Sequence, residues 1–87
     1  MDENQYIITF NSTHHALAFE KAASDNNMKI TILPVPRNIA ASCGLAIMFD
    51  EVDFENITTL IKDKNLNYAG IYIVKNDKGK KDYIRIG

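Results

Sequence analysis

Apolar and polar positions along the chain follow a pattern that predicts both strands and helices. Four runs are rich in β-branched and aromatic residues and are typical of strands: residues 5–10, 29–33, 43–49 and 68–75. The third run is the most continuously apolar, which favours a strand flanked on both sides. A turn is predicted at residues 76–79, so that residues 82–86 return as a hairpin strand in which Ile84 and Ile86 alternate with polar positions.

Two other segments carry apolar residues at the three- and four-residue spacing of a helix. The first is expected over residues 14–25, where the apolar face comprises Ala16, Phe19 and Ala23. Capping side chains are available just before it from Asn11, Ser12 and Thr13. The second helix is expected over residues 54–64, with Asp53 as its N-cap and a hydrophobic staple between Val52 and Ile57. Its apolar stripe comprises Phe54, Ile57, Leu60 and Ile61.

This order of elements predicts an α+β fold, the ferredoxin-like split βαββαβ sandwich, as a single domain over residues 1–87. Two helices would cover one face of an antiparallel sheet with strand order 4-1-3-2, and the C-terminal hairpin strand would be an addition. In this topology the third strand begins beside the end of the first. Cys43 is therefore expected near Thr13 and His14, at the first turn of the first helix.

Composition narrows the function classes. Hydrophobic residues make up 46% of the 87 residues and charged residues 24%, and the net charge of −1 gives no field that would attract nucleic acid or an anionic membrane. The run at 43–49 also lacks the basic and aromatic pattern of an RNA-recognition module. No apolar run approaches the roughly 20 residues of a membrane span. The acidic, polar start is unlike a signal peptide, so a reducing cytoplasm is the expected compartment.

The chain has one cysteine, Cys43, which excludes an internal disulfide and a cysteine-rich zinc site. His14 and His15 would point about 100° apart on a helix and do not form a chelating pair, so no metal site is predicted. Pro34 and Pro36 stiffen the segment that leads to the cysteine. Two readings of the thiol stay open: a small packed side chain, or a reactive thiolate.

Electrostatic groups near Cys43 would favour the reactive form. The N-terminus of the first helix and the guanidinium of Arg37 would each lower the pKa of the thiol from its usual value of about 8.5. Thr13, Ser42 and Gly44 are the candidate residues to bind an anion or a cargo beside the sulfur. His14 could act there as an acid and base.

Two blocks of sequence carry a family resemblance. They are Ile-Thr-Phe-Asn-Ser-Thr-His-His-Ala at residues 8–16, with Glu20, and Ile-Leu-Pro-Val-Pro-Arg at residues 32–37, leading to Ser-Cys-Gly-Leu-Ala at residues 42–46. With these blocks the chain resembles the selenium/sulfur carrier protein-like family of small bacterial domains, over roughly residues 6–70. The arrangement differs from the Cys-Pro-x-Pro loop of the small sulfur-relay proteins.

The resemblance implies a carrier without a cofactor, more a non-enzymatic accessory protein than an enzyme, that holds sulfur or selenium on Cys43 as a persulfide or selenylsulfide. Arg37 would stabilise the anionic cargo, and His14 would assist proton transfer. The implied partners are a donor of the cysteine desulfurase or selenocysteine lyase type and an acceptor that the sequence does not identify.

An alternative of a different class remains open. The loop at residues 34–44 could bind a small anion or metabolite in a regulatory or interaction module, with Cys43 only packed. The basic segment at residues 75–85 predicts a solvated hairpin or a docking surface for an acidic partner. An exposed edge strand with alternating apolar residues leaves a homodimer open.

Overall fold

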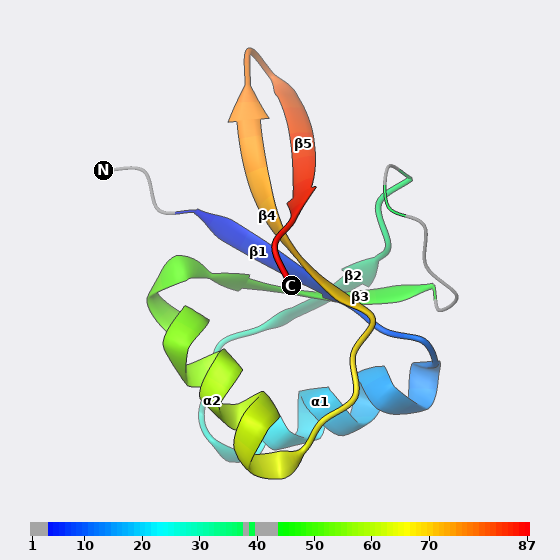
Figure 1. Ribbon diagram of the computed structural model, residues 1–87, viewed down its shortest axis with the longest axis vertical. Helices are drawn as coiled ribbons and strands as arrows, with labels where there is room; N and C mark the ends of the chain where they lie inside the picture. The colour runs from blue at the N-terminus through cyan, green and yellow to red at the C-terminus, as the bar shows by residue number, and fades with distance from the viewer. Residues whose placement is uncertain (1–3, 38, 40–43) are drawn as a thin grey trace.

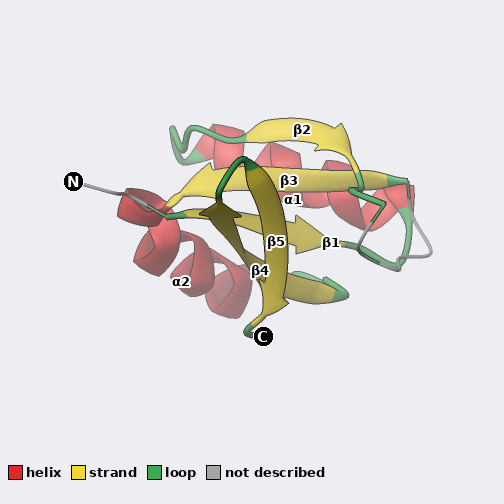
Figure 2. Cartoon of the chain, turned by 90° about the horizontal axis from the view of Figure 1, so that it is seen from above, coloured by secondary structure: helices red, strands yellow, loops and turns green. Residues whose placement is uncertain are grey.

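The computed structural model describes residues 4–37, 39 and 44–87. Its elements, in chain order, are β1 (Gln5–Thr9), α1 (Thr13–Asp25), β2 (Thr31–Pro34), β3 (Leu45–Asp50), a short 3-10 helix η1 (Glu51–Asp53), α2 (Phe54–Lys64), β4 (Gly70–Asp77) and β5 (Lys80–Arg85). Both helices lie on one side of the sheet, and the β4–β5 hairpin rises on the other side (Figures 1 and 2). The protein is therefore an α+β fold, as the sequence predicts.

The five strands form one antiparallel sheet in the order β2-β3-β1-β4-β5. The neighbours of the first four strands are compatible with a ferredoxin-like sandwich, and β5 extends the sheet beyond β4. Thr9 at the end of β1 pairs with Ala46 near the start of β3 and with Gly70 at the start of β4. The loop that precedes β3 and the segment that leads into α1 consequently lie at the same end of the sheet.

Side chains of successive strand residues point to opposite faces, so the sheet has two apolar clusters. The larger cluster lies under the helices and includes Ile8, Phe10, Phe19, Ile47 and Ile57, all fully buried. The smaller cluster lies on the opposite face and is built from Ile7, Ile39 and Ala46, with partly buried neighbours such as Tyr72 and Tyr83. The predicted apolar faces of both helices are confirmed, because their residues all belong to the larger cluster or pack against it.

At the start of α2, one local prediction holds for the position alone and a second is wrong. Asp53 occupies the N-cap position, but its side chain makes no capping hydrogen bond, because η1 leads directly into α2 and gives Asp53 φ −97° and ψ 2° instead of extended backbone. The staple between Val52 and Ile57 does not form either: Val52 is 70% exposed and Ile57 is fully buried. The 3-10 turn directs Val52 to solvent.

Several element ends also differ from prediction. β3 begins at Leu45 instead of residue 43, β4 begins at Gly70 instead of residue 68, and β5 spans Lys80–Arg85 instead of residues 82–86. The hairpin is longer than predicted because its turn is only two residues, Lys78 and Gly79, both with positive φ (50° and 83°). Such a tight turn lets pairing continue out to Asp77 and Lys80.

Candidate functional site

The loop between β2 and β3 is closed at its base by a backbone hydrogen bond. Pro34 and Leu45 form the last pair of the β2–β3 ladder, and the Val35 N–H then donates to the Gly44 carbonyl oxygen at 3.1 Å. Residues 35 and 44 thus extend the ladder by one step and form the neck of the loop. Ser42 and Cys43, the predicted anion-binding and cargo-bearing residues, lie outside the described residues.

Inside the loop, one side chain anchors the chain to the sheet. The Ile39 N–H donates to the Pro36 carbonyl oxygen at 3.0 Å, which makes a tight turn around Arg37. Ile39 is only 6% exposed and packs in the smaller cluster with Ile7 and Ala46. Arg37 is exposed. The loop is therefore held at its neck and at Ile39, while the guanidinium stays in water.

The start of α1 lies at the same end of the sheet as the neck. Ser12 is the N-cap, with extended backbone (φ −151°, ψ 154°), and its hydroxyl accepts a hydrogen bond from the His15 N–H at 3.2 Å. Thr13 and His14 follow in the first turn and are exposed. Because Thr9 pairs with Ala46, only two residues after Gly44, this helix N-terminus and the neck share one end of the sheet. An N-terminus of this kind favours a nearby anion.

Sequence reasoning gave no role to His15. Its Nδ1 atom is buried and has no hydrogen-bond partner among the described residues. The ring centroids of His14 and His15 are 6.4 Å apart and tilted by 55°. Its position could have signalled this burial, since His15 lies four residues before Phe19 and borders the buried face of α1. No group of three or more His, Cys, Asp or Glu side chains within the described part of the chain could hold a metal ion.

At the other end of β3, the carboxylate of Glu51 contacts the hydroxyl of the buried Tyr6. The Tyr6 hydroxyl donates to the Glu51 carboxylate at 3.3 Å, and the same carboxylate oxygen accepts from the Asn4 amide at 2.8 Å. Burial raises the pKa of Tyr6 above its ordinary value of 10.0, and the negative charge of Glu51 and this hydrogen bond raise it further. Asp50 is the last residue of β3, whereas Gly44 lies just before its first residue. The network is therefore at the opposite end of β3 from the neck and is not part of the candidate site.

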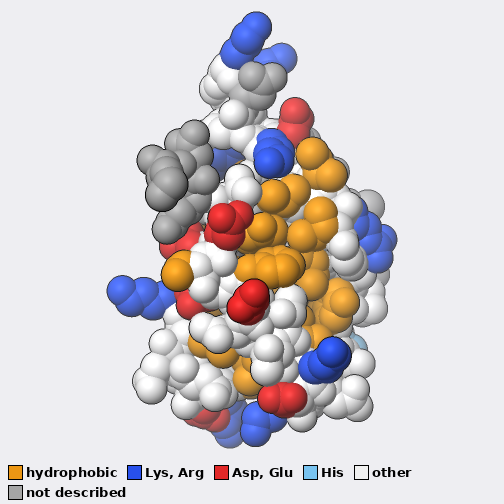
Figure 3. Space-filling model, turned by 60° about the vertical axis from the view of Figure 1, so that its left-hand side comes forward, with side chains coloured by type: hydrophobic (Ala, Val, Ile, Leu, Met, Phe, Trp, Pro, Cys, Tyr) orange, Lys and Arg blue, Asp and Glu red, His pale blue; other side chains and the backbone are white. Residues whose placement is uncertain are grey.

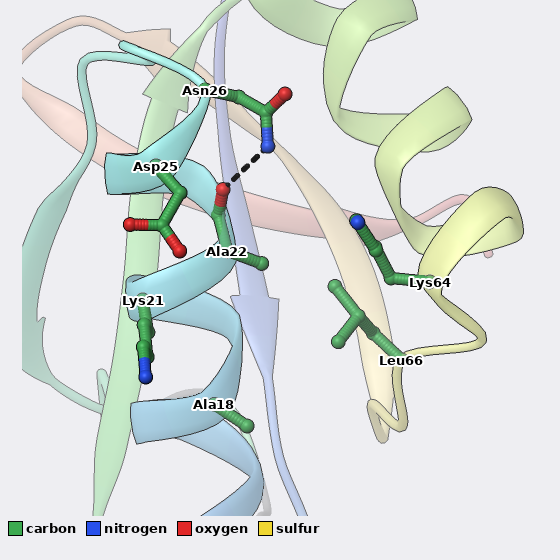
Figure 4. Close-up of a pocket in the computed structure, with 7 residues that line it drawn as sticks. All are labelled: Ala18, Lys21, Ala22, Asp25, Asn26, Lys64 and Leu66. Carbon is green, nitrogen blue, oxygen red and sulfur yellow. Dashed lines mark hydrogen bonds between the residues drawn. The ribbon is translucent and has the colours of Figure 1, made fainter.

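A cavity of about 300 Å³ lies between the ends of α1 and α2 (Figure 4). Lys21 and Asp25 point away from Leu66, and the Asn26 amide is occupied by a hydrogen bond to the Ala22 carbonyl oxygen at 2.8 Å. The polar groups that line the cavity do not converge on a common point. The cavity also lies at the end of α1 opposite Thr13, so it does not belong to the candidate site.

No helix among the described elements is long and apolar enough to cross a membrane. Neither a curated protein nor a solved structure matches the chain significantly. The model of one protein family, described as "Putative Se/S carrier protein-like", matches residues 5–73, which include the start of α1 and the whole β2–β3 loop. The match ends within β4, so most of the hairpin follows it. The chain belongs to this Se/S carrier-like family.

Proposed function

We propose that the protein carries sulfur or selenium on the thiol of Cys43 and passes it between partner enzymes. The observation that carries the proposal is the family match across the β2–β3 loop, together with the fixed neck directly beside Cys43. A backbone held at Gly44 limits where the sulfur can go. The exposed first turn of α1, at the same end of the sheet, favours an anion there.

The chemistry needs one nucleophile. The Cys43 thiolate attacks the outer sulfur of a persulfide on the donor, the donor's S–S bond breaks, and the donor cysteine leaves as a thiolate. Cys43 then holds the transferred atom as a persulfide, or as a selenylsulfide when the atom is selenium. A nucleophile of the acceptor attacks that outer atom and releases the Cys43 thiolate, so no net oxidant or reductant is consumed. The donor is expected to be of the cysteine desulfurase or selenocysteine lyase type.

Other residues of the loop and of α1 would assist without forming covalent bonds to the cargo. Arg37, exposed beside the turn that Ile39 anchors, would stabilise the negative charge of the persulfide. His14 in the first turn of α1 would give or take a proton, and Thr13, Ser42 and Gly44 would offer hydrogen bonds to the anion. The protein then acts as an accessory carrier, and turnover belongs to its partners.

Intact-mass spectrometry tests this proposal. After incubation with a cysteine desulfurase and cysteine, the chain should gain about 32 Da, and the added mass should leave with a reductant. Cys43→Ser should gain nothing, and Arg37→Ala should load more slowly, whereas Lys29→Ala, which removes an exposed cation away from the loop, should load normally. Full activity of Cys43→Ser in cells would contradict the proposal and favour a module whose β2–β3 loop binds a small anion.

A further inference from the structure

The β4–β5 hairpin carries a charge opposite to that of the rest of the chain. Residues 75–87 contain five cations and two carboxylates, a net charge of +3, so the remaining residues carry −4 of the total of −1. The cations are Lys75, Lys78, Lys80, Lys81 and Arg85, and all follow the end of the family match. Figure 3 shows Lys and Arg side chains at the projecting tip. The hairpin is therefore a basic projection on an acidic body.

The cations of the hairpin divide into two kinds. The Arg85 guanidinium donates to the carbonyl oxygens of Ala69 and Gly87, each at 3.1 Å, and so fixes the base of the hairpin. The lysines are exposed. Lys81 pairs with Asn76 across the strands and Lys78 lies in the turn, so neither is opposite a carboxylate in the strand pairing. These two lysines are available to a partner.

An acidic cluster, defined as Asp50, Glu51, Asp53 and Glu55, lies at the same end of the sheet as the hairpin. Gln5 pairs with Asp50 on one side and with Val74 on the other, so the cluster begins about 10 Å, two strand spacings, from the place where the hairpin projects. The hydrogen bonds of Asp50 and Glu51 come from neutral groups of Asn4, Gln5 and Tyr6. Within the described part of the chain, these neutral donors do not offset the negative charges of Asp50 and Glu51.

Apolar surface accompanies the two charged groups. Ile84 in β5 and Ile86 just after it are 51% and 49% exposed. Ile84 pairs with Ile73, and the Ile86 N–H donates to the Ile71 carbonyl oxygen at 2.8 Å. They therefore extend the helix-side apolar face beyond the area that the helices cover. A band of apolar side chains is visible below the hairpin in Figure 3.

We propose that a second copy of the chain covers this face through a two-fold interface. The hairpin of each copy lies against the acidic cluster of the other, with Ile84 and Ile86 near the centre. Two β5 edges do not pair directly, because two strands rich in Lys repel each other. A foreign acidic protein would face the acidic cluster as well as the hairpin, whereas a second copy matches both signs at once. This inference is independent of chemistry at Cys43.

A contact of standard size would take a modest share of the surface of each copy. A standard interface takes about 800 Å² from each partner, roughly one seventh of the total surface of 5843 Å². In a two-fold contact the same pairing of charges occurs twice, since the hairpin of each copy meets the acidic cluster of the other. The interface is predicted to weaken steeply with salt, because its charged groups remain partly solvated.

Sedimentation equilibrium of the Cys43→Ser chain tests the proposal, since that variant excludes dimers linked by a disulfide. We expect twice the chain mass of 9.8 kDa at about 20 mM salt and the monomer mass at about 500 mM. Lys78→Glu with Lys81→Glu should be monomeric at both salt concentrations. Lys21→Glu with Lys29→Glu makes the same change of charge at exposed positions outside the hairpin and should remain dimeric.

A charge exchange identifies the two contacting groups. Asp50→Lys with Glu55→Lys should also be monomeric, but a mixture of this variant with Lys78→Glu and Lys81→Glu should restore a dimer, because both contacts again join opposite charges. Thermal melts establish that each variant is folded, and Glu55→Lys mixed with Lys81→Glu is the milder pair. The proposal is overturned if the Cys43→Ser chain, with its surface charges intact, stays monomeric at low salt. It is also overturned if the mixture of the two charge-reversed variants does not associate.

Discussion

The two faces of the sheet are covered in different ways. On one face, two helices bury a large cluster in which Phe10, Phe19 and Ile57 are fully inaccessible. On the other, a cluster centred on Ile7 and Ala46 is covered by Ile39 of the β2–β3 loop and by side chains of the hairpin. The helix side therefore sets most of the stability of the fold, whereas the loop side holds the segment that bears Cys43. Stability and function should respond to different substitutions.

The largest effect is expected on the helix side. Phe19→Ala should lower the free energy of unfolding by about 3–5 kcal/mol, because it leaves a cavity under α1. Leu17→Ala on the same helix is the control, since Leu17 is 50% exposed and its loss should cost at most about 0.5 kcal/mol. Urea denaturation measures both. Equal losses in the two variants would mean that α1 does not bury Phe19 in the larger cluster.

Ile39→Ala should have a smaller effect on stability and a larger one on the loop. We expect a loss of about 2 kcal/mol, at the low end for such truncations, because the cluster on this face is small. The rate of Cys43 alkylation under native conditions should change several-fold, since the anchor of the loop is gone. Ile32→Ala, at a partly exposed position of β2, is the matched control and should leave alkylation unchanged. An unaltered alkylation rate in Ile39→Ala would mean that the packing of Ile39 in the smaller cluster does not affect the reactivity of Cys43.

Ser12→Ala tests the helix end that the two regions share. Loss of the cap at the His15 N–H should cost about 1 kcal/mol. Ser24→Ala, at an exposed position in the last turn of α1, should cost less. Chemical denaturation gives both values. If the two variants lose the same stability, the Ser12 hydroxyl does not stabilise the N-terminus of α1.

The smallest effect concerns pH and is confined to the helix side. Since folding raises the pKa of Tyr6, the folded state holds this proton more tightly than the unfolded chain. The resulting stability is complete below pH 10.0 and is lost as the pH rises through the higher pKa of the folded state. Across this pH range, the melting temperature should fall less steeply with rising pH for Tyr6→Phe than for the wild type. Tyr83→Phe, which removes a hydroxyl from the opposite face, is the control.

The fold was predictable because its main signals are local and consistent. The helical spacing of Ala16, Phe19 and Ala23 and the apolar run in β3 each identify an element without tertiary information. The start of α2 was not predictable in the same way. Whether Val52 packs or faces solvent depends on the 3-10 turn before the helix, and the residue pattern does not reveal that turn.

The candidate site was predictable only in part. The topology puts Thr13, His14 and Gly44 at one end of the sheet, as the order of elements implies. The anchor Ile39 was missed, because a single apolar residue in a loop has no periodicity that would assign it to a cluster. His15 was missed because burial of one ring nitrogen depends on packing around α1. The proximity of Cys43 to Arg37 and His14 remains a prediction.

The hydrogen bond from Val35 to Gly44 helps to separate the register of the strands from changes of sequence in the β2–β3 loop. Entropy lost in closing a chain segment grows only slowly with its length, and here the closure is already made by the strands below. Apart from Ile39, which packs in the smaller cluster, residues between positions 36 and 43 could be exchanged while the five strands keep their alignment. Substitutions in the β2–β3 loop could thus alter the reactivity of the loop while the sheet and helices keep their structure.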